Sequence, residues 1–318
     1  MAHQITCRIL LGECLARNKD FVETSQSFNR SLFISAILVN GMWLGPLRDV
    51  VAWFTAIKHR WDLQRCVKHL IPEIEDAQSR PGERNDAIEG MLKLAKDDPR
   101  ESQPERMAHQ LMHLMFAGSS APGGLVVQMV YQILTSPAYL APLRQEISKT
   151  LQETAGFNAA FLSRTPLLES FMRETMRLYP TGVVSVTRAV MQEPFRFHDG
   201  LTLPKGSRFA FPIHAIHRDP DNYDDPLSFC GFRTADRKDI NATTVDATFL
   251  NFGFGRHACP GRFFTVRIAK LIFAKLLHEY DMEWEGKTAS RPPNMCIEVQ
   301  NGPNMDAEVK MSKRQVAS

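Results

Sequence analysis

The stretch that most constrains this chain runs from Phe252 to Phe264 and reads FGFGRHACPGRFF. It contains a single cysteine, Cys259, and an amphipathic run follows it at once. Its glycines tolerate positive φ, so the backbone can approach a flat, bulky group closely. Pro260 suits the first position of a helix, which places Cys259 at a helix N-terminus, where free N–H groups and the dipole favour a thiolate. The stretch therefore predicts a lone anionic sulfur, a good ligand for a soft or borderline metal.

From the residues alone, Cys259 is alternatively a buried free cysteine with no ligand role, because free cysteine is among the most buried residue types. Position by position, however, the stretch resembles the haem-ligand loop of the cytochrome P450 family, F-x-x-G-x-[RH]-x-C-x-G. The five fixed places are filled by Phe252, Gly255, His257, Cys259 and Gly261. This resemblance implies haem b (iron protoporphyrin IX), with Cys259 as the axial ligand of the iron. It also implies that His257 binds a propionate and that Phe252 and Gly253 belong to the cofactor-binding loop.

Composition admits a globular enzyme and argues against several other classes. The chain has 318 residues, 44% of them hydrophobic and 23% charged, which is enough apolar mass for a sizeable core. A chain of this length typically folds into about two domains. A net charge of +3 is too small to argue for nucleic acid. Six widely spaced cysteines without a C-x-x-C motif fit a reducing compartment. No run reaches the roughly 18 apolar residues of a membrane span, and we expect neither a signal peptide nor an anchor.

Periodicity predicts a mainly helical chain. Apolar residues recur at helical spacing from Gln4 to about Lys96, and a long helix is expected from about Pro104 to Thr135. The resemblance implies a cytochrome P450-like fold that lacks its N-terminal part, mainly α with a small β region. We expect one such domain over residues 1–318, with a helical substrate-side part at 1–100 and a haem-binding part at 101–318.

The middle of the long helix carries a fault, FAGSSAPGG. Pro122 cannot donate to the carbonyl of Gly118, and its ring clashes there. The residues predict either a kink with a free carbonyl or two helices joined by a loop. The resemblance implies a helix across the haem face with an A/G-G-x-D/E-T motif, yet Ser120 and Ala121 stand at the acid and threonine positions. We therefore hypothesise that Ser119 or Ser120, with water, relays protons to bound dioxygen.

Two further patterns precede this fault, and each has two interpretations. An apolar stripe lines either a substrate pocket or the core, and it comprises Met112, Met115 and Phe116. HQLMH puts His109 and His113 four residues apart, as in helical zinc hydrolases, but Gln110 stands where those enzymes need a glutamate base.

A second motif lies in TPLLESFMRETMRLYP, which predicts a helix. Glu174 and Arg177 share one helical face, where such a pair is usually solvated. However, ETMRLYP resembles the family's E-x-x-R helix, which implies a buried network of Glu174, Arg177 and a second arginine, Arg233. The neighbouring pair, Glu169 and Arg173, is predicted to be exposed surface.

The rest of the chain predicts short strands and one more helix. Residues 182–216 contain β-prone runs. The resemblance makes this region a small sheet beside the haem, with Arg188 on a propionate, whereas a solvated strand-end charge is the alternative. A helix is expected after the Cys259 loop to about Tyr280. In the tail, the resemblance implies a loop near Glu298 to Gly302 that dips towards the substrate.

Together these features resemble a fungal microsomal monooxygenase. The resemblance implies electrons from an NADPH-cytochrome reductase, a hydrophobic substrate such as a terpenoid or polyketide, no nucleic acid, and an endoplasmic reticulum membrane surface for full-length members. Without an anchor, this chain is alternatively cytoplasmic. Two other functions stay open. The absence of the family's early helices favours a non-catalytic or inactive haemoprotein fragment, and the missing threonine favours an isomerase or dehydratase.

Overall fold

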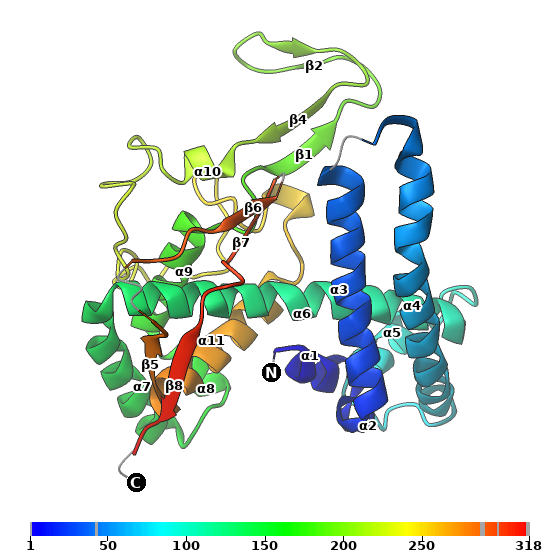
Figure 1. Cartoon of the computed structure of the whole chain (residues 1–318), viewed down its shortest axis with the longest axis horizontal. Coiled ribbons are helices and arrows are strands. Elements are labelled where there is room, and N and C mark those ends of the chain that lie inside the picture. Colours follow the sequence, from blue (N-terminus) through cyan, green and yellow to red (C-terminus); the bar gives the residue numbers. More distant parts are fainter. Residues whose placement is uncertain (1, 42–43, 287–289, 298, 316–318) are drawn as a thin grey trace. The chain divides into compact units, whose positions relative to one another are not determined.

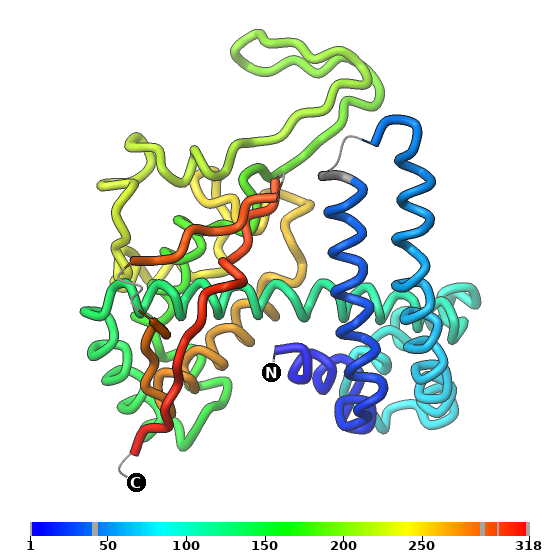
Figure 2. The backbone as a smooth tube through the Cα atoms, viewed as in Figure 1, coloured from blue at the N-terminus to red at the C-terminus, as the bar shows by residue number. Residues whose placement is uncertain are grey.

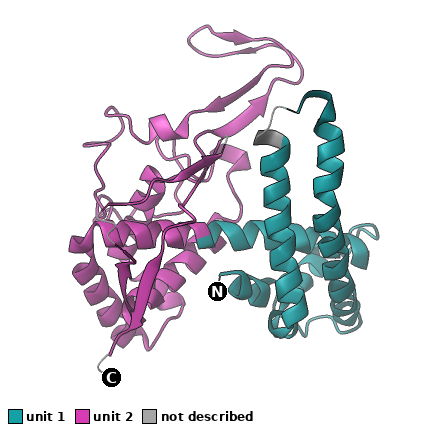
Figure 3. Ribbon diagram, viewed as in Figure 1, with its two compact units in different colours: residues 1–123 teal, residues 124–318 magenta. Residues whose placement is uncertain are grey.

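The computed structural model describes residues 2–41, 44–286, 290–297 and 299–315. The chain forms two compact units, residues 1–123 and 124–318 (Figure 3). The boundary lies inside one long helix, α6 (Pro104–Thr135). The substrate-side and haem-side roles expected for the two parts of the chain stay predictions. Glu298, in the loop expected near the substrate, lies outside the described residues.

The described part of the first unit is helical. In chain order its elements are α1 (Ala2–Leu11), α2 (Glu13–Arg17), α3 (Lys19–Gly41), the 3-10 turn η1 (Gly45–Leu47), α4 (Arg48–Ser79), α5 (Ala87–Leu94) and the first part of α6. The two long helices α3 and α4 lie side by side and run in opposite directions (Figures 1 and 2). The Asp86 side chain caps α5 by accepting from the amide of Glu89 at 3.2 Å, as expected for an aspartate at a helix start.

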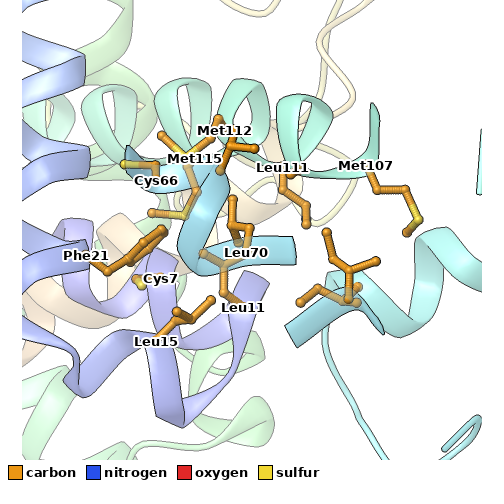
Figure 4. Packing of buried hydrophobic residues seen from close by; sticks show 14 of the residues in the cluster. Cys7, Leu11, Leu15, Phe21, Cys66, Leu70, Met107, Leu111, Met112 and Met115 are labelled. Carbon is orange, nitrogen blue, oxygen red and sulfur yellow. The ribbon is translucent and has the colours of Figure 1, made fainter. Parts of the chain in front are cut away.

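An apolar cluster forms the core of the first unit. Met112 and Met115 point from α6 into this cluster beside Phe21 and Cys7 (Figure 4). Both methionines are fully buried, at 1% and 0% exposure, and Phe116 packs against the same cluster. Of the two interpretations of this stripe, the structure therefore supports the core and not a substrate pocket.

The helix α6 continues through Pro122, so the alternative of two helices joined by a loop is wrong. Its bounds are those that the sequence predicts. Pro122 leaves the carbonyl of Gly118 without its usual amide donor. The hydroxyl of Thr6, on α1, donates to that carbonyl oxygen at 2.9 Å. A side chain from a distant helix thus replaces the missing backbone hydrogen bond.

The second unit holds the remaining helices. They are the end of α6, the 3-10 turn η2 (Pro137–Tyr139), α7 (Leu140–Thr154), α8 (Ala159–Ser163), α9 (Pro166–Leu178), α10 (Ile213–Ile216), the 3-10 turn η3 (Gly255–His257) and α11 (Arg262–Glu279). The central helix α9 is buried from Ser170 to Leu178. Phe171 of α9 stacks on Phe273 of α11, with ring centroids 5.7 Å apart. Glu146 of α7 accepts from two backbone amides in the first turn of α9, at 2.7 and 2.9 Å, which satisfies donors that a helix start leaves free.

The described strands form two-stranded antiparallel ladders in the second unit, and the predicted fold class, mainly α with a small β region, is confirmed. The pairs are β1 (Ser185–Ala189) with β4 (Arg208–Phe211), β2 (Phe195–Arg196) with β3 (Thr202–Leu203), β5 (Tyr280–Trp284) with β8 (Val309–Lys313), and β6 (Met295–Ile297) with β7 (Gln300–Gly302). In β1, Arg188 lies opposite Phe209 of β4.

Candidate functional site

Cys259 lies on a tight loop that presents its side chain at the surface. Gly253 and Gly255 both have positive φ, at 73° and 71°, a conformation that other residues rarely adopt. The amide of Cys259 donates to the carbonyl of Phe252 at 2.7 Å, which closes the loop. A side chain at Gly261 would approach the sulfur of Cys259, with its Cβ 3.9 Å away. The loop therefore presents an exposed thiol whose backbone is held by the amide hydrogen bond to Phe252.

The buried-cysteine interpretation does not apply to Cys259, whose residue is exposed. It applies instead to Cys7 and Cys66, which are fully buried in the first unit. Burial raises the pKa of both thiols to about 12, so neither supplies a thiolate near neutral pH.

The helix after the cysteine begins later than expected. Helix α11 starts at Arg262 with Gly261 as its N-cap, so Pro260 lies in the preceding turn and is not the first helical residue. The carbonyl of Cys259 accepts from the amide and the guanidinium of Arg262, at 3.4 and 2.8 Å. Cys259 thus lies three residues before Arg262, the first residue of α11, and its carbonyl accepts from that residue.

A network of buried charges lies on α9, and the structure brings its three expected members together. Arg177 donates twice to the carboxylate of Glu174, both at 2.8 Å, and Arg233 donates to the same carboxylate at 3.2 and 3.3 Å. The amide of Cys230 adds a fourth donor at 2.9 Å. Arg177 is 1% exposed and also donates to three backbone carbonyls, those of His217, Pro226 and Ser228. The network therefore fixes the segment from 217 to 233 against α9.

The expectation that Glu169 and Arg173 form exposed surface is wrong. They do not pair with each other, and Arg173 is 7% exposed. Its guanidinium donates to the carbonyls of Asn241 and Thr244, at 2.9 and 2.8 Å. Glu169 binds the ammonium group of Lys270 on α11. Spacing alone could not reveal this, because α9 is covered on nearly every face and no exposed side is left for such a pair.

The residues expected at the haem propionates are present but lack carboxylate partners. Arg188 is half-buried, and its guanidinium donates to the neighbouring carbonyl of Thr187 at 2.9 Å. His257 is exposed in η3. In the described part of the chain no ion pair involves either residue, and no hydrogen bond joins either to Cys259. Both groups are thus available to an external anion such as a carboxylate.

The two serines of the α6 fault have different surroundings in the first unit. Ser119 is 7% exposed, and its hydroxyl donates to the carbonyl of Met115 at 2.6 Å. The same oxygen lies 3.0 Å from Nδ1 of His3, whose Nε2 lies 2.8 Å from the hydroxyl of Ser25. Ser120 is exposed, and within the described residues its hydroxyl has no hydrogen-bond partner. Ser119 is therefore occupied by an internal network, whereas Ser120 is free to bind water.

A buried histidine that the sequence did not single out connects the network to the Cys259 loop. His217 is 0% exposed and hydrogen-bonds to the backbone at both ring nitrogens, to the carbonyl of Arg177 and the amide of Leu250, each at 3.0 Å. The signal available was its place in the HRDP segment, but nothing local indicates which backbone groups the ring contacts.

The donor chemistry fits a metal whose other ligands come from a porphyrin. No group of three or more histidine, cysteine or acidic residues in the described part of the chain could hold a metal ion. His109 and His113 are exposed and lack a third ligand there, which argues against the zinc hydrolase. Cys259 supplies one sulfur on an open, glycine-rich loop. A single thiolate suits haem iron, since four nitrogens belong to the cofactor.

A mainly helical fold, a glycine-rich cysteine loop before a long helix, and a buried E-x-x-R network define the haem-thiolate class. The family model described as "Cytochrome P450" matches residues 1–304, and the chain belongs to that family. It is 36% identical over 333 residues to the cytochrome P450 monooxygenase sirB of Leptosphaeria maculans, an alignment that covers 100% of this chain and 64% of that protein. It is 29% identical to the aspergilol synthase AuAP450 of Aspergillus ustus, covering 98% and 60%.

The chain thus spans under two thirds of the length of these curated relatives. Among solved structures, the retinoic acid-bound cyanobacterial CYP120A1 superimposes with a TM-score of 0.76 at 20% identity, covering 98% of this chain and 67% of that one. A cytochrome P450DA haem domain gives a TM-score of 0.75 at 17% identity, covering 99% and 66%. At this identity the likeness shows the fold. Within the described residues, no helix has the length and apolar character needed to span a bilayer.

Proposed function

We propose that the chain binds haem b through Cys259 and acts as a monooxygenase, which inserts one oxygen atom from O2 into a hydrophobic small molecule. The observation that carries this proposal is the exposed thiol of Cys259 on a loop closed by its own amide. Gly253 and Phe252 belong to the same loop, and the positive φ of Gly253 and Gly255 suits a backbone that lies close to a flat cofactor.

The site residues would act on the cofactor in distinct ways. Cys259 would ligate the iron, and the cationic or hydrogen-bonding groups of Arg188 and His257 would bind the propionates. When bound, thiolate-ligated haem supplies the activation of dioxygen. The chain's own task is to hold the sulfur in place, orient the substrate and deliver protons. The network of Glu174, Arg177 and Arg233 supports the first of these tasks.

Proton delivery falls to Ser120 with water. Of the two candidate hydroxyls, Ser119 already donates to a backbone carbonyl and contacts His3, whereas Ser120 is exposed. A hydroxyl that both donates and accepts can pass a proton between waters. The missing acid–threonine pair also keeps a second function open, a family member that catalyses isomerisation or dehydration and needs no such delivery.

The substrate and partners follow from the family's relatives. The similarity to fungal proteins named as monooxygenases and as an aspergilol synthase supports a fungal secondary metabolite as substrate, a terpenoid being one example. Electrons would come from an NADPH-cytochrome reductase at the endoplasmic reticulum membrane.

A membrane surface is supported by an exposed apolar stripe on α4. The residues of this stripe recur at helical spacing, and each is about half exposed. The stripe comprises Val50, Trp53, Phe54, Ile57 and Trp61. Tryptophan and phenylalanine on one face of a helix are typical of interfacial binding. Trp53→Ser with Phe54→Ser should lower co-sedimentation of the chain with phospholipid vesicles. Leu94→Ser, which removes an isolated apolar side chain that is 90% exposed, should leave it unchanged.

The decisive experiment for the reaction is isotopic. The haem-loaded chain, a fungal reductase and NADPH are supplied with 18O2 and a panel of hydrophobic metabolites. One labelled oxygen per product supports monooxygenation. A rearranged or dehydrated product without label favours the alternative, and stable haem binding without any product favours an inert haemoprotein.

A further inference from the structure

His217 lies between the E-x-x-R helix and the cysteine loop, and both of its ring nitrogens contact main-chain groups. It follows α10 directly and is 0% exposed. Nδ1 lies 3.0 Å from the carbonyl oxygen of Arg177, and Nε2 lies 3.0 Å from the amide nitrogen of Leu250. Because neither main-chain partner can exchange its role as donor or acceptor, this pair of contacts determines the state of the ring.

The chemistry selects one tautomer. A carbonyl oxygen only accepts, so Nδ1 of His217 must carry the hydrogen; an amide only donates, so Nε2 must offer its lone pair. The ring is then neutral. A proton on Nε2 would set two N–H groups against each other and leave the amide of Leu250 without an acceptor in a buried place.

The amide of Leu250 is the start of a short chain of backbone contacts that ends at Cys259. The carbonyl of Leu250 accepts from the amide of Gly253 at 2.9 Å, which forms the turn into the loop. The carbonyl of Phe252, within that turn, accepts from the amide of Cys259 at 2.7 Å. The ring of His217 therefore anchors the first residue of the turn that holds the cysteine amide.

The other side of the ring is fixed by the network on α9. Arg177 donates to the carbonyl of His217 at 2.5 Å while its own carbonyl accepts from Nδ1, so the two residues are bonded reciprocally. The ring also stacks on Phe249, with centroids 5.3 Å apart and planes at 11°, and the guanidinium of Arg173 covers the Phe249 ring at 3.7 Å. These contacts prevent the imidazole from turning.

We propose that His217, as the neutral Nδ1–H tautomer, is a positioning residue that transmits the fixed geometry of the E-x-x-R network to the Cys259 loop. This role rests on the proposed function in one respect, the ligation of haem iron by Cys259. It goes beyond the three-residue network, because among the described residues neither Glu174 nor Arg233 hydrogen-bonds to the segment from 249 to 253. The charged groups near the ring are Arg173 and Arg177 of α9 and the adjacent Arg218, all of which disfavour a positive charge on it.

The experiment compares three substitutions in the whole chain. His217→Gln can keep the acceptor for Leu250, His217→Asn can keep the donor to Arg177, and His217→Phe keeps the flat ring on Phe249 with neither hydrogen bond. Hydrogen exchange of peptides covering 249–259 is measured without haem. The thiolate-type carbon monoxide band is then measured after haem loading.

If His217 positions the loop through Leu250, His217→Gln retains slow exchange and the thiolate band. His217→Phe and His217→Asn should exchange about tenfold or more faster, the factor expected when a buried amide loses its acceptor, and should lose part of the thiolate band. If the ring acts only by packing, the order reverses and His217→Phe stays nearest to the wild type. That order overturns the proposal.

A measurement on the unmodified chain keeps the test decisive if a variant does not fold. Nitrogen-15 spectra of labelled histidine distinguish a protonated Nδ1 from a protonated Nε2, and an Nε2–H ring at His217 contradicts the proposal. If Cys259 does not ligate haem iron, the result differs from the result expected if His217 does not position the loop. A wild-type chain without any thiolate band refutes ligation by Cys259, whereas the exchange order and the tautomer still report on His217.

Discussion

The E-x-x-R network of the second unit and the α6 fault of the first unit are both polar regions in helices, yet they are stabilised in opposite ways. In the network, the carboxylate of Glu174 binds two arginines that its own motifs supply. In the fault, the polar groups left by Pro122 are bound by residues outside any motif. The hydroxyl of Thr6 takes the carbonyl of Gly118, and His3 contacts Ser119.

This difference shows what a complete motif and a degraded one each reveal. Where every motif residue is present, the partners are named by the motif itself, so its chemistry can be inferred from the sequence. Where residues are replaced, the remaining polar groups still need partners once buried. Those partners come from one helix, α1, more than 100 residues away in the chain. The substitution also leaves one exposed hydroxyl, that of Ser120, for another role.

The largest effect should come from Glu174→Gln. The change leaves Arg177 buried with its charge uncompensated, and breaking a buried ion pair in this way costs about 3–5 kcal/mol of unfolding free energy. Urea unfolding followed by circular dichroism measures the loss. Glu153→Gln, on an exposed pair with Lys149 at 4.0 Å, is the matched control and should change stability by less than about 1 kcal/mol. Equal losses in both variants would contradict the buried network.

The next largest effect should come from lowering the pH, because a buried neutral histidine lies in each of the two regions and lowers the free energy of unfolding in acid. Burial lowers the pKa of His217 and that of His3, each to about 4. As the pH falls below about 6.5, these histidines are therefore protonated in the unfolded chain before they are protonated in the folded chain. Between pH 6.5 and 4, each histidine lowers the free energy of unfolding by up to about 1.4 kcal/mol per pH unit. Above pH 6.5 this contribution is fully present.

The hydrogen-bond partners of the two histidines differ in whether they can accept from a protonated ring. The hydroxyls of Ser25 and Ser119 can accept from a protonated His3, whereas the amide of Leu250 cannot accept from His217. We expect His217→Gln to flatten the decline of urea stability between pH 7 and 5 more than His3→Gln does. A larger flattening with His3→Gln would contradict this assignment.

A smaller loss of stability is expected when the donor near Pro122 is removed, and a second substitution should restore most of it. Thr6→Val removes the donor to the carbonyl of Gly118 and should cost about 1 kcal/mol, because a partly buried acceptor is left unpaired. Adding Pro122→Ala restores a backbone amide and should recover most of this loss. The double-mutant cycle is read from urea midpoints. Additive effects would show that Thr6 does not replace the missing backbone donor.

The smallest effect on stability should come from the serines, where the two positions should differ in kind. Ser119→Ala removes a buried hydroxyl bound to Met115 and His3 and should cost about 1 kcal/mol. Ser120→Ala should cost under about 0.5 kcal/mol, as for most exposed positions, but should lower product per electron in the haem-loaded chain. Unchanged coupling after both replacements would rule out the serine relay.

Local patterns predicted the helices well, while the side-chain partners needed the fold. The bounds of α6 follow from apolar spacing and flanking breaks, and Glu174 and Arg177 share a face by helical geometry. Lys270 of α11, which binds Glu169 of α9, lies 101 residues away, and nothing in either segment signals the contact. Such contacts depend on how distant helices pack.

The cysteine loop lies between these cases. Its glycine conformations were predictable because glycine tolerates positive φ, which Gly253 and Gly255 both adopt. The start of α11 two residues after Pro260, and the anchoring of Leu250 by His217, were not. A helix boundary is set by backbone hydrogen bonds over a full turn, and a buried histidine has no spacing rule.

Ligation of haem iron by the sulfur of Cys259 can be tested with one spectrum. The chain and its Cys259→Ser variant are loaded with haem, reduced and exposed to carbon monoxide. The wild-type chain should show a thiolate-type band, and the Cys259→Ser variant should lose it completely. Cys230→Ser, which alters an exposed thiol elsewhere in the second unit, should keep the band. A wild-type chain without this band, or a Cys259→Ser variant that retains it, would contradict ligation of the iron by Cys259.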